Sequence, residues 1–128
     1  MGGQMTNGKA QKFAEEWIRA WSRKDAEAVL AHFAEDVEFT SPKALAAVGR
    51  ATVRSKRELT GYWHTALKAV ESIRFTLESV INDEAAGRVV IVYVSEINGK
   101  KVRAAEFFQF DDASRVIRGE AMYGVAAE

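Results

Sequence analysis

The chain has 128 residues, 48% hydrophobic and 28% charged, which is the balance of a single globular domain large enough for a core and a pocket. Lysine plus arginine and aspartate plus glutamate number 18 each, and this zero net charge gives no electrostatic reason to expect a nucleic acid or an anionic membrane as partner. The absence of cysteine excludes disulfides, thiol catalysis and thiolate metal sites, and no apolar run approaches the roughly 18 residues that span a bilayer.

The N-terminal segment, residues 1–8, is rich in glycine and asparagine, and we expect it to be disordered. It lacks the apolar stretch of a signal peptide, so we expect a cytoplasmic protein. No repeat or low-complexity segment divides the remainder, and residues 9–128 are predicted to form one domain.

Two helices joined by a short polar turn are predicted to open the domain. Residues 9–23 carry apolar side chains at helical spacing on one face, and Asp25 is typical of the cap of a second helix that ends near Phe33. The apolar residues of the first helix are Phe13, Trp17, Ile18 and Trp21. Such a pair forms a helical hairpin.

Residues 36–41 alternate as a strand does, and Pro42 ends them because proline cannot donate to a strand ladder. The basic segment 43–57 is predicted to be a solvated loop or a short edge strand, broken at Gly49. A third helix is expected from Ser55 to Val70. Its cap is Ser55, followed three residues later by Glu58 in the capping-box position.

Four strands are predicted to complete the chain, at residues 73–81, 88–97, 101–110 and 116–125. Asn98-Gly99 is a strong signal for a tight hairpin. Helices followed by a run of strands indicate the α+β class, with a curved, mostly antiparallel sheet wrapped around the helical hairpin and the third helix.

The strand at residues 88–97 is apolar on both faces. Val90, Val92 and Val94 would form a bare apolar row on the outer face of the sheet unless something covered them. The simplest cover is the same face of a second copy, so we expect a homodimer with two-fold symmetry.

This order of elements, together with the segments FAEEWIRAWSRKDAEAVLAHFAEDVEFTSP and FFQFDDASRVIRGEAMYG, resembles the nuclear transport factor 2-like superfamily, and within it the SnoaL-like and ketosteroid isomerase-like branch. The resemblance covers residues 9–124. It implies a cone-shaped α+β barrel that encloses a pocket and is usually dimeric. It implies no single reaction, because the superfamily hosts isomerases, cyclases, epoxide hydrolases, dehydratases and non-enzymatic binding domains.

The resemblance also identifies two positions where the isomerases carry acidic residues. The residue before the proline is their general base, and here it is Ser41, which cannot accept a proton at neutral pH without a stronger base beside it. The oxyanion-stabilising acid corresponds to Glu106, which we expect to lie in apolar surroundings, to have a raised pKa and to act as an acid. Strand alternation is expected to place Phe39, Ser41, Glu106 and Tyr123 along one enclosed wall.

Aromatic residues replace the hydroxyl-bearing side chains of the isomerases. Trp17, Phe33 and Trp63 occupy the positions of the family's tyrosines, so the family's hydroxyl chain is absent. These aromatic side chains either pack in the core or form an aromatic wall for a flat ligand. The other residues expected at the pocket are Phe39, Phe108, Tyr62 and Tyr123, with Tyr93 as a further hydroxyl donor.

We expect no cofactor and no metal, because the two histidines, His32 and His64, have no carboxylate at ligand spacing. The basic segment 43–57 could present a cation to an acidic ligand or remain a solvated loop. Two functions follow as hypotheses. The first is a pocket for a small hydrophobic molecule, with acid chemistry from Glu106 on a carbonyl-containing substrate. The second is a non-catalytic ligand-binding or protein-interaction module of the same fold.

Overall fold

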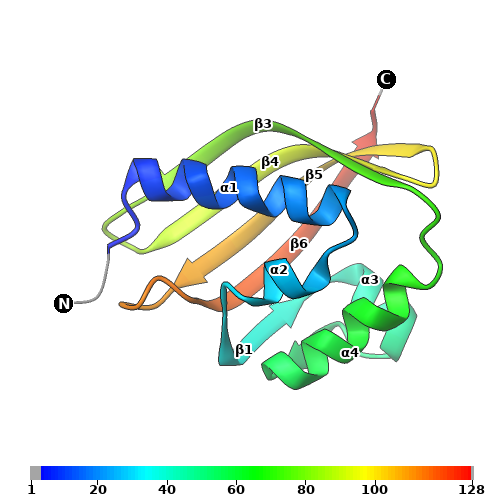
Figure 1. Ribbon diagram of the computed structural model, residues 1–128, viewed down its shortest axis with the longest axis horizontal. Coiled ribbons are helices and arrows are strands. Elements are labelled where there is room, and N and C mark those ends of the chain that lie inside the picture. The colour runs from blue at the N-terminus through cyan, green and yellow to red at the C-terminus, as the bar shows by residue number, and fades with distance from the viewer. Residues whose placement is uncertain (1–3, 128) are drawn as a thin grey trace.

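The computed structural model describes residues 4–127. It contains α1 (Asn7–Ser22), α2 (Ala26–Leu30), β1 (Phe33–Thr40), α3 (Pro42–Val48), β2 (Thr52–Arg54), α4 (Lys56–Leu67), β3 (Ile73–Asp83), β4 (Arg88–Ile97), β5 (Lys100–Phe110) and β6 (Val116–Ala126). The predicted α+β class is confirmed, with helices leading and four antiparallel strands closing the chain (Figure 1).

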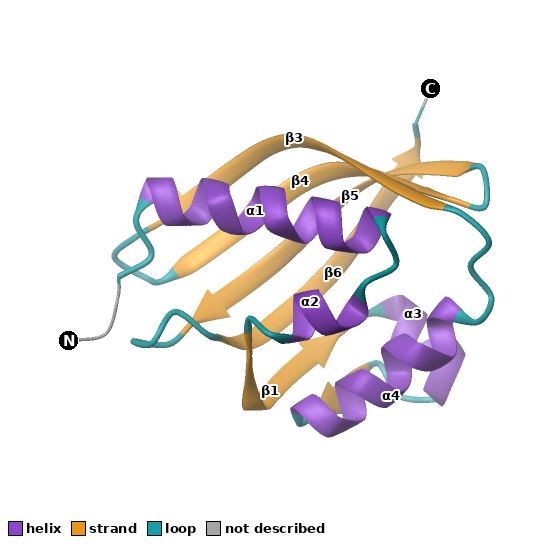
Figure 2. Cartoon of the chain, viewed as in Figure 1, coloured by secondary structure: helices purple, strands orange, loops and turns teal. Residues whose placement is uncertain are grey.

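All six strands form one curved sheet in the order β2-β1-β6-β5-β4-β3. The β1–β6 pair is parallel and the other pairs are antiparallel. The sheet has two free edges, β2 and β3, so the barrel expected from the resemblance is an open, curved sheet. Figure 2 shows α1, α2 and α4 in front of it, with α1 lying across β3, β4 and β5, and α2 and α4 nearer β1.

The first helix begins at Asn7, two residues earlier than expected, with Thr6 accepting a hydrogen bond from the backbone N–H of Lys9 at 3.2 Å. Asn82 of β3 holds this start, because its amide donates to the carbonyl of Met5 at 2.9 Å, and the Met5 side chain is buried. Residues 5–8, which composition assigned to a disordered segment 1–8, are therefore part of the folded domain. Residues 1–3 lie outside the described range.

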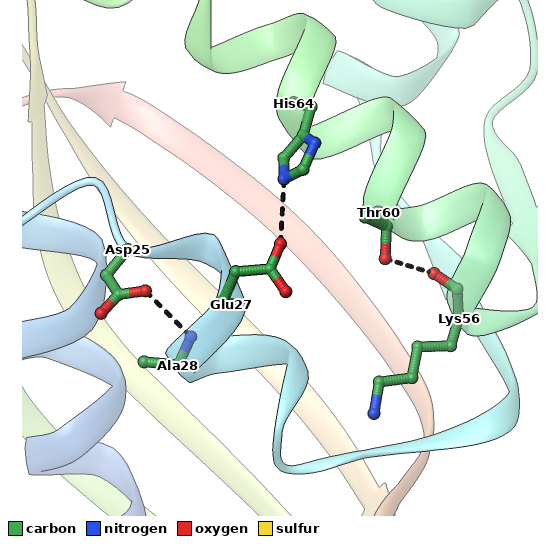
Figure 3. Close-up of polar contacts among 6 residues, drawn as sticks. All are labelled: Asp25, Glu27, Ala28, Lys56, Thr60 and His64. Carbon is green, nitrogen blue, oxygen red and sulfur yellow. Dashed lines mark hydrogen bonds and ion pairs between the residues drawn. The ribbon is translucent and has the colours of Figure 1, made fainter.

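The second helix has the predicted cap, since Asp25 accepts from the backbone N–H of Ala28 at 3.1 Å (Figure 3). It ends at Leu30, and Phe33 starts β1 instead of closing the helix. The cause is pairing across the sheet: the N–H of Val116 donates to the carbonyl of His32 at 2.8 Å, and Phe33 lies opposite Val116.

The basic segment 43–57 contains more structure than the predicted loop. Ser41 caps α3 and Pro42 occupies its first turn, while Gly49 ends it with φ of +79°, a conformation that glycine adopts without strain. The short edge strand, one of the two alternatives predicted for this segment, does form as β2 and pairs with β1. Only the short helix α3 escaped the sequence pattern.

The fourth helix has the predicted cap, with the Ser55 hydroxyl accepting from the N–H of Glu58 at 3.2 Å. The Glu58 carboxylate accepts from the N–H of Arg54 at 2.9 Å. The helix ends at Leu67, three residues before the expected end. His64 and Glu27, 3.1 Å apart, connect α4 to α2 on the surface (Figure 3).

The Asn98-Gly99 hairpin is confirmed, with both residues at positive φ (52° and 82°). The Asn98 side chain also fixes the loop between α4 and β3, donating to the carbonyl of Ala69 at 2.9 Å and accepting from the N–H of Glu71 at 2.7 Å. The turn of the β4–β5 hairpin is thereby attached to the loop that follows α4. No helix within residues 4–127 is long and apolar enough to cross a membrane.

Candidate functional site

A cavity of about 300 Å³ lies between the helices and the sheet. It is bounded by the C-terminal halves of α1 and α4, the start of α3 and the helix-covered faces of β1, β3, β4, β5 and β6. Seven of the residues expected at the pocket line it: Trp17, Phe39, Ser41, Tyr62, Trp63, Glu106 and Tyr123. The four residues assigned to one wall by strand alternation, Phe39, Ser41, Glu106 and Tyr123, are all among them.

Two expected pocket residues, Phe33 and Phe108, do not line this cavity and belong to the packed core behind it. Both are 2% exposed. The Phe33 ring centroid lies 5.4 Å from that of Trp63, and the Phe108 centroid 6.0 Å from that of Trp17. They support the indoles that face the cavity, which is the core-packing alternative left open by the sequence.

Glu106 is a buried acid on the cavity wall. Its side chain lies on β5, with Ile91 of β4 and Ala121 of β6 directly opposite, and the residue is 5% exposed. The Tyr93 hydroxyl donates to Glu106 Oε1 at 3.1 Å. Burial raises the pKa of Glu106 to about 8, although the Tyr93 hydrogen bond and the nearby charge of Lys43 act in the opposite direction. At neutral pH the group is mostly a neutral carboxylic acid that can donate a hydrogen bond.

Three tyrosine hydroxyls surround this acid. Burial raises the pKa of Tyr62, Tyr93 and Tyr123, and in each case the Glu106 carboxyl adds to the increase. These phenols therefore stay protonated and act as hydrogen-bond donors near neutral pH. The cavity lining is consequently rich in neutral donors.

Ser41 has a structural task that explains a serine at this corner. It is 1% exposed, and its hydroxyl accepts from the backbone N–H of Lys43 at 3.1 Å, which caps α3. Hydrogen bonding to Ser41 also lowers the pKa of Tyr62 and of Tyr123 against the effect of burial. The serine ends β1, begins α3 and orients cavity hydroxyls, and no stronger base contacts it among the described residues.

Lys43 brings a cation to the cavity, which the sequence raised only as one option for the whole segment 43–57. Its Nζ lies 4.5 Å from the centroid of the Tyr123 ring. Burial lowers the pKa of Lys43, the Glu106 carboxyl raises it and Lys100 lowers it further. By contrast, Arg50 and Arg54 of the same segment form surface ion pairs with Glu58 and Glu38, each at 3.4 Å.

The histidines lie away from the cavity. The His32 ring packs edge-on against Phe13 with centroids 5.1 Å apart, and burial lowers the pKa of His32 despite Glu16 at 3.4 Å. His64 is exposed and faces Glu27. Within residues 4–127, no group of three His, Asp or Glu side chains is placed to hold a metal ion.

Several cavity residues were missing from the sequence-based set, notably Trp21, Phe75 and Lys43, and Tyr93 was included only as a further hydroxyl donor. Trp21 and Phe75 were visible as apolar members of their elements, and Tyr93 as a free hydroxyl donor. Alternation gives the face on which a side chain lies, but not whether its position along the strand is beside the cavity. Packing brings these rings together: Trp17 lies against Tyr93 (4.9 Å between ring centroids) and Phe75 (5.4 Å), and Trp21 lies against Trp63 (4.9 Å).

Comparison with known proteins gives the same fold. Residues 14–118 match the model of the SnoaL-like domain. A SnoaL-like protein of unknown function from Burkholderia thailandensis E264 is 30% identical with a TM-score of 0.84, over 96% of this chain and 100% of that one. An NTF2-like protein of unknown function from Burkholderia pseudomallei K96243 is 20% identical with a TM-score of 0.75, over 90% of each chain.

A third similar structure is TerC co-crystallized with polyporic acid, at 15% identity and a TM-score of 0.73, over 90% of this chain and 91% of that one. No curated protein matched the sequence. The family model covers most of the chain. This chain belongs to the SnoaL-like family of the nuclear transport factor 2-like superfamily.

Proposed function

We propose that the cavity binds a small hydrophobic molecule bearing a carbonyl group, and that protonated Glu106 donates a hydrogen bond to the carbonyl oxygen. The observation that carries this proposal is the buried carboxyl group of Glu106 in a cavity lined largely by aromatic residues, with its Oε1 accepting from the Tyr93 hydroxyl and its pKa raised by burial. The other carboxyl oxygen is the one available to donate. The co-crystallization of TerC, which has a similar fold, with polyporic acid is compatible with such a use of this cavity.

An acid that donates to a carbonyl oxygen stabilises negative charge developing there. A reaction at the neighbouring carbon also needs a base, and the position of the family's base is held by Ser41, which caps α3. This observation favours a second candidate function, a binding module that holds such a ligand without turnover. The two functions share one cavity and one ligand class, and they differ in whether a proton is moved.

Variants of Glu106 test the proposal with 2-acetylnaphthalene as a neutral aromatic ketone. Glu106→Leu removes the donor and is expected to weaken binding about tenfold, the usual scale for one buried hydrogen bond. Glu106→Gln keeps an N–H donor and an acceptor for Tyr93, so it should retain most of the affinity. Isothermal calorimetry at pH 6.5 measures both. Equal binding by the wild-type protein and Glu106→Leu contradicts the proposed hydrogen bond.

Exchange of the ketone's methyl protons in D₂O separates the catalytic from the non-catalytic function. Wild-type protein that accelerates the exchange, with the acceleration lost in Glu106→Gln, is expected of an acid catalyst. Binding with no acceleration in either protein identifies the binding module.

The outer sheet face supports the proposal of a homodimer. Val90, Val92 and Val94 are only partly buried there. They continue into exposed apolar neighbours, with Ile81 and Phe107 directly opposite Val90 and exposed by 57% and 37%. An apolar row of this extent across three strands favours a second copy as its cover.

Val92→Lys is expected to convert a dimer to a monomer, because it places two charges at the centre of the two-fold contact. Sedimentation velocity at micromolar concentration measures the change, and circular dichroism checks that the fold persists. Leu45→Lys, at an exposed site on α3, is the control. A wild-type protein that sediments as a monomer removes the dimer from consideration.

A further inference from the structure

The cavity wall carries one amine as well as the carboxyl group of Glu106. Of all the lining residues, only Lys43 and Glu106 have ionisable acid or amine side chains, and near neutral pH burial keeps Glu106 mostly protonated. Lys43 is therefore the source of net charge at this site. Its ammonium lies over the face of Tyr123, 4.5 Å from the ring centroid, where the ring's electron density holds a cation.

Lys43 has no ion-pair partner among residues 4–127 within 4 Å. Two other cations of the segment, Arg50 and Arg54, are paired with surface carboxylates. Lys43 is an exposed residue that also lines the cavity. Its amine therefore keeps part of its hydration and is available to an anionic group of a ligand through a charge-assisted hydrogen bond.

The backbone fixes where the amine can reach. Lys43 is the second residue of α3, and its N–H is bonded to the Ser41 hydroxyl at 3.1 Å. Ser41 itself is anchored through its N–H to the carbonyl of Ala51 at 2.8 Å. These bonds hold the start of α3 against the end of β1, so the Lys43 side chain extends from a fixed point at the cavity rather than from a loop.

We propose that Lys43 selects ligands carrying an acidic group, so that the molecule held in the cavity is an aromatic or unsaturated carboxylate. This inference rests on the proposed function and deepens it: the aromatic body packs against Trp17 and Trp63, its carbonyl faces Glu106, and its carboxylate pairs with Lys43. The outer charges of the segment take no part in recognition.

The test compares 2-naphthoate with 2-naphthamide, two ligands of nearly equal shape that differ in charge. Calorimetry at pH 6.5 and low salt is expected to give about tenfold tighter binding of the carboxylate to wild-type protein, the scale of one charge-assisted hydrogen bond. The preference is expected to vanish in Lys43→Met and to persist in Lys43→Arg. It should also shrink as salt is added, because a partly exposed pair is screened.

Lys101→Met is the matched control, since it removes the same charge from an exposed site on β5 that does not line the cavity. It is expected to leave the preference unchanged. Equal affinity of wild-type protein for both ligands overturns the inference while leaving the ketone test of Glu106 intact. No binding of 2-naphthoate to wild-type protein, or an equal loss of preference in Lys101→Met, overturns it as well.

Discussion

Glu106→Gln is expected to become progressively more stable than the wild-type protein as pH rises from about 4.5 to about 8. The pKa of Glu106 is raised by burial to about 8 in the folded protein, against 4.5 for the exposed group. The folded state therefore holds a proton that the unfolded state releases, and wild-type stability falls across this window. Between pH 4.5 and pH 8 the shift lowers the wild-type free energy of unfolding by on the order of 4 kcal/mol.

Wild-type stability falls as pH rises because the folded state favours the neutral form of Glu106. The stability that Glu106 contributes is fully present below pH 4.5 and is lost as the pH passes through the folded pKa. Glutamine does not titrate and can still accept from the Tyr93 hydroxyl. Urea denaturation at fixed protein concentration between pH 4 and pH 9 measures the two profiles.

Glu120→Gln is the matched control, because Glu120 is an exposed carboxylate on the neighbouring strand β6. It is expected to follow the wild-type profile. If Glu106→Gln also follows that profile, Glu106 is ionised in the folded protein at neutral pH, and its proposed role as a hydrogen-bond donor is lost.

Trp17→Ala is expected to lower the free energy of unfolding by about 3–5 kcal/mol, the usual cost of deleting a buried aromatic side chain. Trp17 is 2% exposed, and its ring contacts those of Phe75, Tyr93 and Phe108, with centroids 4.9–6.0 Å apart. The indole joins α1 to three strands. Its removal would also enlarge the cavity that it lines.

Urea denaturation of Trp17→Ala at pH 6 measures this loss as a lower midpoint with an unchanged slope. Leu45→Ala is the control, since Leu45 is 55% exposed and its truncation should cost less than about 1 kcal/mol. A loss of similar size in the two variants would show that the aromatic cluster between α1 and the sheet contributes little to stability.

Much of this architecture could be predicted from periodicity. The helical spacing of Phe13, Trp17 and Trp21 indicates the buried face of α1, and all three are buried. Strand alternation placed Glu106 inward, and it is buried on the cavity wall. The Asn98-Gly99 signal located a hairpin correctly because its requirement for positive φ is local to two residues.

Short or non-local features escaped the same reasoning. The seven residues of α3 span about two turns, too few for a hydrophobic period to emerge. The end of α2 was misplaced because pairing of Phe33 with Val116, more than eighty residues later, outcompetes continuation of the helix.

The order of residues along the chain was enough to tell which side of each element turns inward, because that depends only on a repeat of 2 or about 3.6 residues. It was therefore also enough to predict that an acid, a serine and a tyrosine would share the inner side of the sheet. The depth of each side chain, and the groups that meet there, emerged from packing: Tyr93 with Glu106, the Lys43 amine with the Tyr123 ring, and Phe33 and Phe108 behind the cavity. Such meetings depend on strand register and helix placement over long sequence separations, which no local period encodes.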